Sequence, residues 1–109
     1  MNSRQLAAYV TDQLSGLPEV RSIPMMGGYI FYYRERIIGG IYEPGFLLKD
    51  VPAARAAMPD AELVPVEEGG RPKLLTCTIL DDREKLQAMV TAMWPELPAR
   101  KPRKKKVDA

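Results

Sequence analysis

Residues 20–49 read VRSIPMMGGYIFYYRERIIGGIYEPGFLLK, and this stretch decides the fold class. Two runs of β-branched and aromatic residues, 29–33 and 37–42, flank a short polar segment, which is the pattern of a β-hairpin. A further run, 46–49, follows the turn residues at 43–45. Because the strand signals recur at intervals of roughly nine residues, the simplest arrangement is an antiparallel meander.

The segment in front of this hairpin, residues 20–25, predicts another strand, which leads into the glycine pair Gly27 and Gly28. Glycine adopts positive φ without steric cost, so the pair permits a bend just before the next strand. We expect Met25 and Met26 to pack against the helices, because methionine adapts to irregular gaps. The whole stretch therefore holds three or four strands.

A second hairpin is predicted downstream, from residues 62–66 and 73–80 on either side of EEGGR. Cys77 alternates with threonines in the returning strand and is predicted to be a small core residue. Gly39 and Gly40 fall inside a predicted strand of the first hairpin. A glycine pair in that place indicates a bulge or a close approach of another backbone.

Three helices are predicted around these strands. The first begins after Ser3 as its N-cap and has apolar residues at the spacing of an amphipathic helix. A short alanine-rich helix follows, with Asp50 as its cap. The last helix begins at Asp81 or Asp82 and stops at Pro95. One apolar stripe runs along it, made of Leu86, Met89, Val90 and Met93.

This order of helices and strands predicts an α+β domain of two layers, in which the helices cover one face of an antiparallel sheet. A chain of 109 residues is long enough for one hydrophobic core, so a single domain is expected over residues 1–97. Residues 98–109 have prolines and cations without apolar periodicity. We expect them to form a disordered tail.

The tail carries the excess of positive charge. Six of the sixteen basic residues and one of the fourteen acidic residues lie at 100–109, which gives this segment +5 and leaves residues 1–99 at −3. A phosphate backbone would attract such a tail without sequence selectivity. The alternative is a terminus that serves only solubility. The candidate nucleic-acid contacts are Arg100, Lys101, Arg103, Lys104, Lys105 and Lys106.

Catalytic and metal-binding patterns are absent from the sequence. The chain has no histidine and one cysteine, which excludes the common nucleophilic triads and most zinc sites. Its glycine pairs match no nucleotide-binding fingerprint. The paired acids at 67–68 and 81–82 are better explained as turn and cap residues than as an acid–base pair. We therefore predict a protein that is not an enzyme, with no cofactor and no metal.

The location expected from the sequence is the cytoplasm, without a membrane partner. No apolar run is long enough to span a bilayer, and the amino terminus lacks the layout of a signal peptide. A lone cysteine fits a reducing compartment.

Aromatic residues are concentrated in the meander, where six of the eight lie between residues 29 and 46. Along 29–33 the side chains alternate, so Ile30 and Tyr32 point away from Phe31. The outer face of the sheet would then be partly apolar. Such faces mark partner surfaces or dimer interfaces, although tyrosine is also common on solvent-facing strands. The candidate interaction surface is Tyr29, Tyr32 and Tyr42.

The order of these motifs resembles the amino-terminal domain of the TfoX/Sxy family of bacterial competence regulators. The resemblance runs through VRSIPMMGGYIFYY, IIGGIYEPGFLLKD, GGRPKLLTCTIL and DDREKLQAMVTAMW and covers residues 3–97. Met26 stands where the family usually has Phe, and a lysine-rich tail stands in place of the second, helical domain of the full-length regulators. The sharpest match is the family motif Met26, Gly27, Gly28 and Tyr29.

The resemblance implies a fold of one helix, three strands, a helix, two strands and a helix, similar to the secretion-chaperone-like arrangement. It also implies a non-catalytic regulatory module that acts through protein contacts, with a protein partner or a second copy of the chain, in transcriptional control of competence or DNA-uptake genes. Two alternatives stand beside it. One is auxiliary, non-specific nucleic-acid binding through the tail. The other is a small-molecule or enzymatic function at residues 25–29, where titratable groups are scarce.

Overall fold

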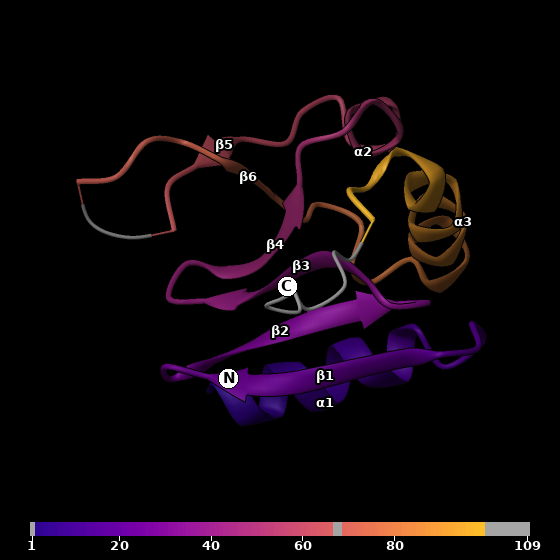
Figure 1. Ribbon diagram of the computed structural model, residues 1–109, viewed down its shortest axis with the longest axis horizontal. Coiled ribbons are helices and arrows are strands. Elements are labelled where there is room, and N and C mark those ends of the chain that lie inside the picture. Colours follow the sequence, from indigo (N-terminus) through magenta and orange to yellow (C-terminus); the bar gives the residue numbers. More distant parts are fainter. Residues whose placement is uncertain (1, 67–68, 100–109) are drawn as a thin grey trace, which may run out of the picture.

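A computed structural model describes residues 2–66 and 69–99 of the chain (Figure 1). These residues form a six-stranded antiparallel sheet with three α-helices, so the predicted α+β class is confirmed. In chain order the elements are α1 (Ser3–Gln13), β1 (Val20–Met25), β2 (Gly28–Tyr33), β3 (Arg36–Tyr42), β4 (Gly45–Lys49), α2 (Pro52–Ala57), β5 (Leu63–Val64), β6 (Leu74–Thr76), α3 (Arg83–Met93) and the 3₁₀ helix η1 (Trp94–Glu96).

The first four strands form the predicted meander. They are neighbours in chain order, after which β6 pairs with β4 and β5 lies at the far edge, giving the order β1-β2-β3-β4-β6-β5. β1 pairs with β2 along its full length. Four strands therefore separate α1 from α2, and the count of three that the family resemblance implied is wrong.

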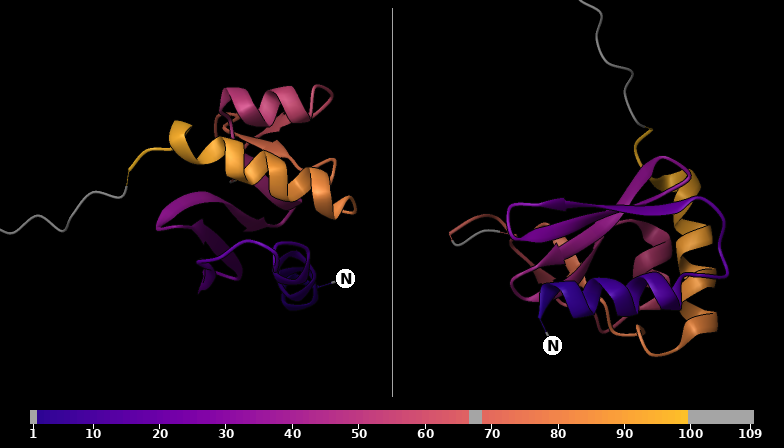
Figure 2. Two further views of the ribbon diagram at one scale, coloured as in Figure 1. Left: turned by 90° about the vertical axis from the view of Figure 1, so that its right-hand side faces the viewer. Right: turned by 90° about the horizontal axis from the view of Figure 1, so that it is seen from below.

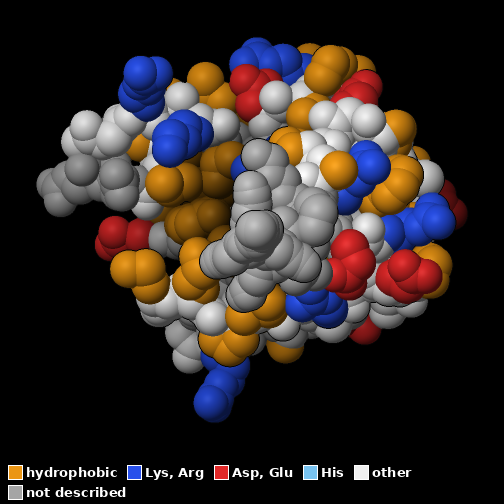
Figure 3. Space-filling model, in the orientation of Figure 1, with side chains coloured by type: hydrophobic (Ala, Val, Ile, Leu, Met, Phe, Trp, Pro, Cys, Tyr) orange, Lys and Arg blue, Asp and Glu red, His pale blue; other side chains and the backbone are white. Residues whose placement is uncertain are grey.

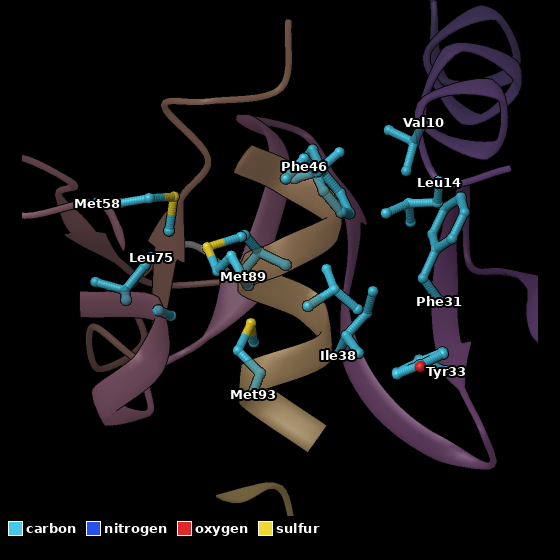
Figure 4. Close-up of a cluster of buried hydrophobic side chains, with 14 of the residues drawn as sticks. Val10, Leu14, Phe31, Tyr33, Ile38, Phe46, Met58, Leu75, Met89 and Met93 are labelled. Atoms are coloured by element: carbon cyan, nitrogen blue, oxygen red, sulfur yellow. The ribbon is translucent and has the colours of Figure 1, made fainter. Parts of the chain in front are cut away.

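All three helices contribute to one hydrophobic core. Figure 4 shows Val10 and Leu14 of α1 directed toward Phe31 of β2. The Phe31 ring meets the Phe46 ring edge-on, with 5.8 Å between the ring centroids. Met89 and the rest of the predicted stripe of α3 are buried in the same cluster. Figure 2 shows α1 and α3 running in different directions beside the strands. The prediction of helices gathered on one face is confirmed.

The cap of α1 is one residue earlier than predicted. Asn2 accepts a hydrogen bond from the Gln5 N–H at 2.8 Å, and the Gln5 side chain accepts one from the Asn2 N–H at 3.0 Å. Asn2 and Ser3 are both good cap residues, but a reciprocal capping box needs Glu or Gln three residues later. Gln5 has that spacing from Asn2, and Ser3 becomes the first helical residue.

The predicted cap of α2 is wrong, and the predicted cap of α3 is confirmed. The N-cap position of α2 is Val51, which makes no side-chain cap. Asp50 instead accepts two hydrogen bonds from the Arg55 guanidinium, and this arginine holds the pKa of the Asp50 carboxyl below its usual value. Asp82 caps α3 through the Lys85 N–H, as predicted.

The second hairpin is shorter than predicted, because the neighbouring strand β4 is too short to pair with the whole predicted segment. β6 pairs with β4, which begins at Gly45 directly after a turn. The last backbone hydrogen bond in this direction joins the Cys77 N–H to the Phe46 carbonyl at 3.1 Å. Beyond it, the Thr78 N–H donates to the sulfur of Met58. Cys77 follows β6 and is half-buried, so it packs against the core as a partly buried residue and is not one of the fully buried core residues.

Two of the three tight turns of the meander, those between β1 and β2 and between β2 and β3, place two consecutive residues at positive φ. The values are 46° and 85° for Met26 and Gly27, and 48° and 68° for Arg34 and Glu35. Two such residues in succession define the type I′ turn, whose twist matches that of the flanking strands. The bend predicted at the first glycine pair is confirmed.

Gly39 and Gly40 show both features that a glycine pair in a strand indicates. The pairing of β2 with β3 shifts register between Phe31 and Tyr32, across from these glycines. A Cβ atom on Gly40 would lie 2.4 Å from the carbonyl oxygen of Tyr29. The sheet is thus irregular and tightly packed here, as predicted.

Candidate functional site

One face of the meander is largely apolar, and no helix formed by residues 2–66 and 69–99 covers it. The register of the sheet places Ile23 opposite Ile30, and Tyr32 opposite Ile37, on the side away from the core. Figure 3 looks onto this side, where hydrophobic side chains gather around a hollow with Lys and Arg near its rim. We call this surface the open face. Its apolar members include the buried Leu47 and Ile30 and the more accessible Ile23, Met25, Tyr32, Ile37 and Tyr42.

The end of the open face near the β2–β3 turn is covered by a charged pair. The guanidinium carbon of Arg21 lies 4.2 Å from the centroid of the Tyr32 ring. The same guanidinium donates hydrogen bonds of 3.1 and 3.0 Å to Glu35, which raise the pKa of Arg21. Tyr32 is therefore half-buried, with one side of its ring covered by a cation.

The other end of the open face is hollowed. An open depression of about 650 Å³ lies where the β1–β2 turn, β3 and the chain after β5 meet. Tyr42 lines it and is half-buried, and burial raises the pKa of its hydroxyl. Its walls are mainly apolar, formed by Met25, Met26, Ile30, Ile41, Tyr42 and Val66, with Ser3 and Glu43 as polar members.

The three tyrosines predicted as one surface do not lie on one face of the sheet. Tyr32 and Tyr42 lie on the open face, where alternation predicted Tyr32. Tyr29 pairs with Ile41 on the opposite side and packs against the core, although it also contributes to the rim of the hollow. Grouping Tyr29 with Tyr32 and Tyr42 was therefore wrong, because an odd separation along a strand reverses the side chain.

The family motif Met26, Gly27, Gly28 and Tyr29 is the β1–β2 turn and the start of β2. Gly27 supplies the positive φ, and a Cβ on Gly28 would lie 2.1 Å from the Ile41 carbonyl oxygen. These two glycines therefore have architectural roles.

Met26 is the residue that sequence reasoning placed wrongly. Its side chain was expected to pack against the helices, yet it is 97% exposed, and that of Met25 is 49% exposed. The glycine pair between two strand-like runs was the signal for a tight turn, and a two-residue turn that ends at Gly27 would have put Met26 at the tip of the hairpin. The tip then points its side chain into solvent.

The described residues offer little for acid–base or metal chemistry. Within residues 2–66 and 69–99, no group of three His, Cys, Asp or Glu side chains is placed to hold a metal ion. Asp82 of the acidic pair at 81–82 caps α3, and Asp81 accepts a hydrogen bond from the Tyr9 hydroxyl. The pair at 67–68 lies outside the described residues. Burial raises the pKa of the Cys77 thiol to about 11, which keeps it protonated at neutral pH.

The cations predicted to contact nucleic acid all lie beyond residue 99 and outside the described residues, namely Arg100, Lys101, Arg103, Lys104, Lys105 and Lys106. Among the helices of the described chain, none is long and apolar enough to cross a membrane.

Comparisons with known proteins give a similarity to one protein without an assigned activity. The chain is 29% identical over 100 residues to a protein of Spirochaeta aurantia described as an uncharacterized 12.7 kDa protein in the trpE 5′ region. The match covers 92% of this chain and 87% of that protein. No model of a known protein family matches the chain, and no solved structure does.

Proposed function

We propose that this protein is a non-catalytic module of the cytoplasm that binds another protein through its open face. The observation that carries the proposal is the apolar character of a sheet face that no helix covers, with Ile23 and Met25 exposed at 39% and 49%. An apolar patch of this kind, bordered by polar residues such as Arg21 and Glu35, is typical of a protein contact surface.

Aromatic side chains supply the expected binding energy. Tyr32 and Tyr42 are half-buried and present both ring surface and a hydroxyl to a partner, a combination that is enriched at interface hot spots. Tyr42 borders the hollow, so an apolar side chain of the partner would have a concave place to enter. Truncating either ring should cost about 2 kcal/mol of binding free energy.

The test compares tyrosine-to-alanine variants on the two sides of the molecule. Proteins that bind the tagged full chain in its source cell are captured, identified and then titrated in purified form against each variant. Tyr32→Ala and Tyr42→Ala should weaken the purified complex, and Tyr9→Ala, on the polar α1–α3 side, should leave it unchanged. Equal affinity of all three variants would place the binding surface elsewhere.

The resemblance to the TfoX/Sxy family suggests the process that this binding serves. We propose a regulatory role in transcription of competence or DNA-uptake genes, with the open face contacting a component of that control. Three strains of the source organism test this role: a deletion of the gene, the deletion restored with wild type, and the deletion restored with Tyr32→Ala/Tyr42→Ala. The levels of DNA-uptake transcripts should change in the deletion strain and in the strain with the double variant, and should be normal in the strain restored with wild type. Unchanged transcript levels in every strain would contradict the regulatory role. Protein binding through the open face is tested separately, by the titration.

A further inference from the structure

The tip of the β1–β2 hairpin exposes an apolar residue in a conformation that disfavours it. Met26 has φ 46° and is 97% exposed. In a type I′ turn this position is usually Asn, Asp or Gly, because a longer L-residue is strained in the left-handed region. A methionine there weakens the turn and gains no packing within the chain. A contact with another molecule would account for it.

Two hollows flank this tip and share it as a wall. One, of about 520 Å³, is lined by the start of α1, including Arg4, and by residues 24–29. The other is the hollow of the open face, which includes Glu43. The tip thus has an apolar knob, Met26, an apolar hollow beside it, a cation on one side and an anion on the other. Within residues 2–66 and 69–99, neither Arg4 nor Glu43 forms an ion pair.

We propose that the hairpin tip is a homodimer contact with two-fold symmetry. Met26 of each copy enters the apolar hollow of the other, beside Ile30 and Tyr42, and Arg4 of each copy pairs with Glu43 of the other. Because knob and hollow are neighbours on one surface, a rotation by 180° makes both insertions at once, and the contact closes as a dimer. The same rotation brings the cation of one copy over the anion of the other, which gives charge complementarity.

Pairing through the sheet edge is a poorer route to a dimer. The Arg34 N–H donates to the Glu19 carbonyl at 3.0 Å, so in this ladder the odd-numbered residues of β1 bond to β2. The backbone groups of Val20, Ser22 and Pro24 therefore point to the free edge. Pro24 has no N–H to donate, and a proline on an edge strand is a common protection against such pairing.

Tyr32 distinguishes the partner surface of the proposed function from the dimer contact, although the hollow beside Tyr42 belongs to both. Tyr32 lies near the β2–β3 turn, at the opposite end of β2 from the hairpin tip. Tyr32→Ala should therefore leave self-association unchanged while weakening a partner complex. If the chain does not dimerise but its affinity for a captured partner still depends on Tyr32, the dimer proposal is wrong and the proposed function stands.

The main test is sedimentation velocity of the full chain over a wide concentration range. Wild type should form a dimer, and Met26→Asp should raise the dimer dissociation constant about a hundredfold, because two buried methionines per dimer are replaced by charge. Asp-Gly is a favoured type I′ sequence, so this variant should fold at least as well as wild type, as circular dichroism at low concentration would verify. Met26→Leu keeps an apolar side chain and should still dimerise. A wild type that stays monomeric at sub-millimolar concentration, or a Met26→Asp dimer of unchanged affinity, would overturn the proposal.

Charge reversal tests the two-fold arrangement itself. Arg4→Glu and Glu43→Arg should each weaken the dimer several-fold, since each places like charges together twice. The double variant Arg4→Glu/Glu43→Arg restores opposite charges across the contact and should regain most of the lost affinity. A double variant that is no tighter than the single variants would overturn the proposed pairing of the two copies.

Discussion

Gly39 of β3 leaves no room for a side chain against the neighbouring strand β4. A Cβ atom at this position would be 2.0 Å from the Leu47 carbonyl oxygen and 2.8 Å from the Leu48 Cα atom. Both are backbone atoms of β4, and backbone atoms in a sheet cannot move away by a change of rotamer, as the end of a side chain can. The glycine is therefore required by the neighbouring strand and not by its own conformation alone.

Replacing Gly39 should destabilise the fold far more than replacing a glycine that has only an unusual conformation. We expect Gly39→Ala to lower the free energy of unfolding by about 3 kcal/mol or more, because the sheet must open to admit the methyl group. Gly45→Ala is the matched control: its φ of 131° is strained for alanine, yet nothing lies within 4 Å of the added atom. That cost should be about 1–2 kcal/mol. Urea unfolding followed by circular dichroism gives both values, and similar costs would contradict the clash.

Cys77 is a second position where burial has a measurable consequence. Burial raises the pKa of its thiol from 9.0 to about 11. The thiolate is therefore disfavoured in the folded chain. The contribution of the protonated thiol to the free energy of unfolding is fully present below pH 9 and is lost as the pH rises from about 9 to about 11.

Two measurements check this behaviour. The folded chain at pH 8 should react with a thiol reagent much more slowly than the urea-unfolded chain, since the thiolate is the reactive form. The difference in unfolding free energy between wild type and Cys77→Ser should change in favour of Cys77→Ser as the pH rises from 9 to 11. Comparing the two chains cancels the titration of tyrosines and lysines in the same range. A constant difference would show that the thiol titrates normally.

At the scale of elements, the end of α3 is tied to the β2–β3 hairpin by arginines and a tryptophan. The guanidinium carbons of Arg36 and Arg34 lie 3.9 and 5.0 Å from the centroid of the Trp94 ring. Arg36 also donates to the carbonyl oxygens of Trp94 at 2.9 Å and Leu97 at 3.3 Å, and the indole N–H donates to the Arg34 carbonyl. These contacts satisfy carbonyl groups that a helix end leaves open.

The two arginines should differ in their importance to stability. Arg36 is half-buried and joins a stacked ring to two carbonyl groups, so Arg36→Ala should lower the free energy of unfolding by about 2 kcal/mol. Arg34 is exposed and only stacks, so Arg34→Ala should cost less than about 1 kcal/mol. Thermal and urea unfolding of the two variants decide this, and an equal or reversed order would contradict it.

The elements themselves were well predicted wherever local signals decide them. The strand at Val20–Met25 and the first two hairpins follow from the β-branched and aromatic runs and from the short glycine-containing or polar segments between them. The second hairpin was overestimated because its length depends on β4, which starts only at Gly45. A residue such as Thr78 has a strand-like pattern but no strand beside it, and local sequence contains no information on that neighbour.

At the scale of the whole molecule, the positive and negative charges are unevenly distributed along the chain. Residues 1–99 have a net charge of −3 and residues 100–109 have +5. Nucleic-acid binding should therefore depend on residues 100–109. We expect weak binding to DNA of any sequence, with a slope of log affinity against log salt of up to about −5 for six cations.

Truncation after Leu97 tests this directly. The shortened chain should lose DNA binding in fluorescence anisotropy at low salt, while its unfolding free energy stays close to that of the full chain. As a matched control, replacing the six cations of the tail with glutamine should have the same effect at unchanged length. DNA affinity that survives both changes would assign the binding to the folded domain.

The sequence by itself determined the fold class, the meander and the turns, because periodicity, turn chemistry and helix stripes are properties of neighbouring residues. Only the tertiary structure decided that β6 lies beside β4, which side of β2 faces the core, that Tyr42 of β3 shares the open face with Tyr32, and that two hollows flank the exposed Met26. Those features depend on which distant segments come together. That choice rests on the packing of the whole core, which no local stretch of sequence encodes.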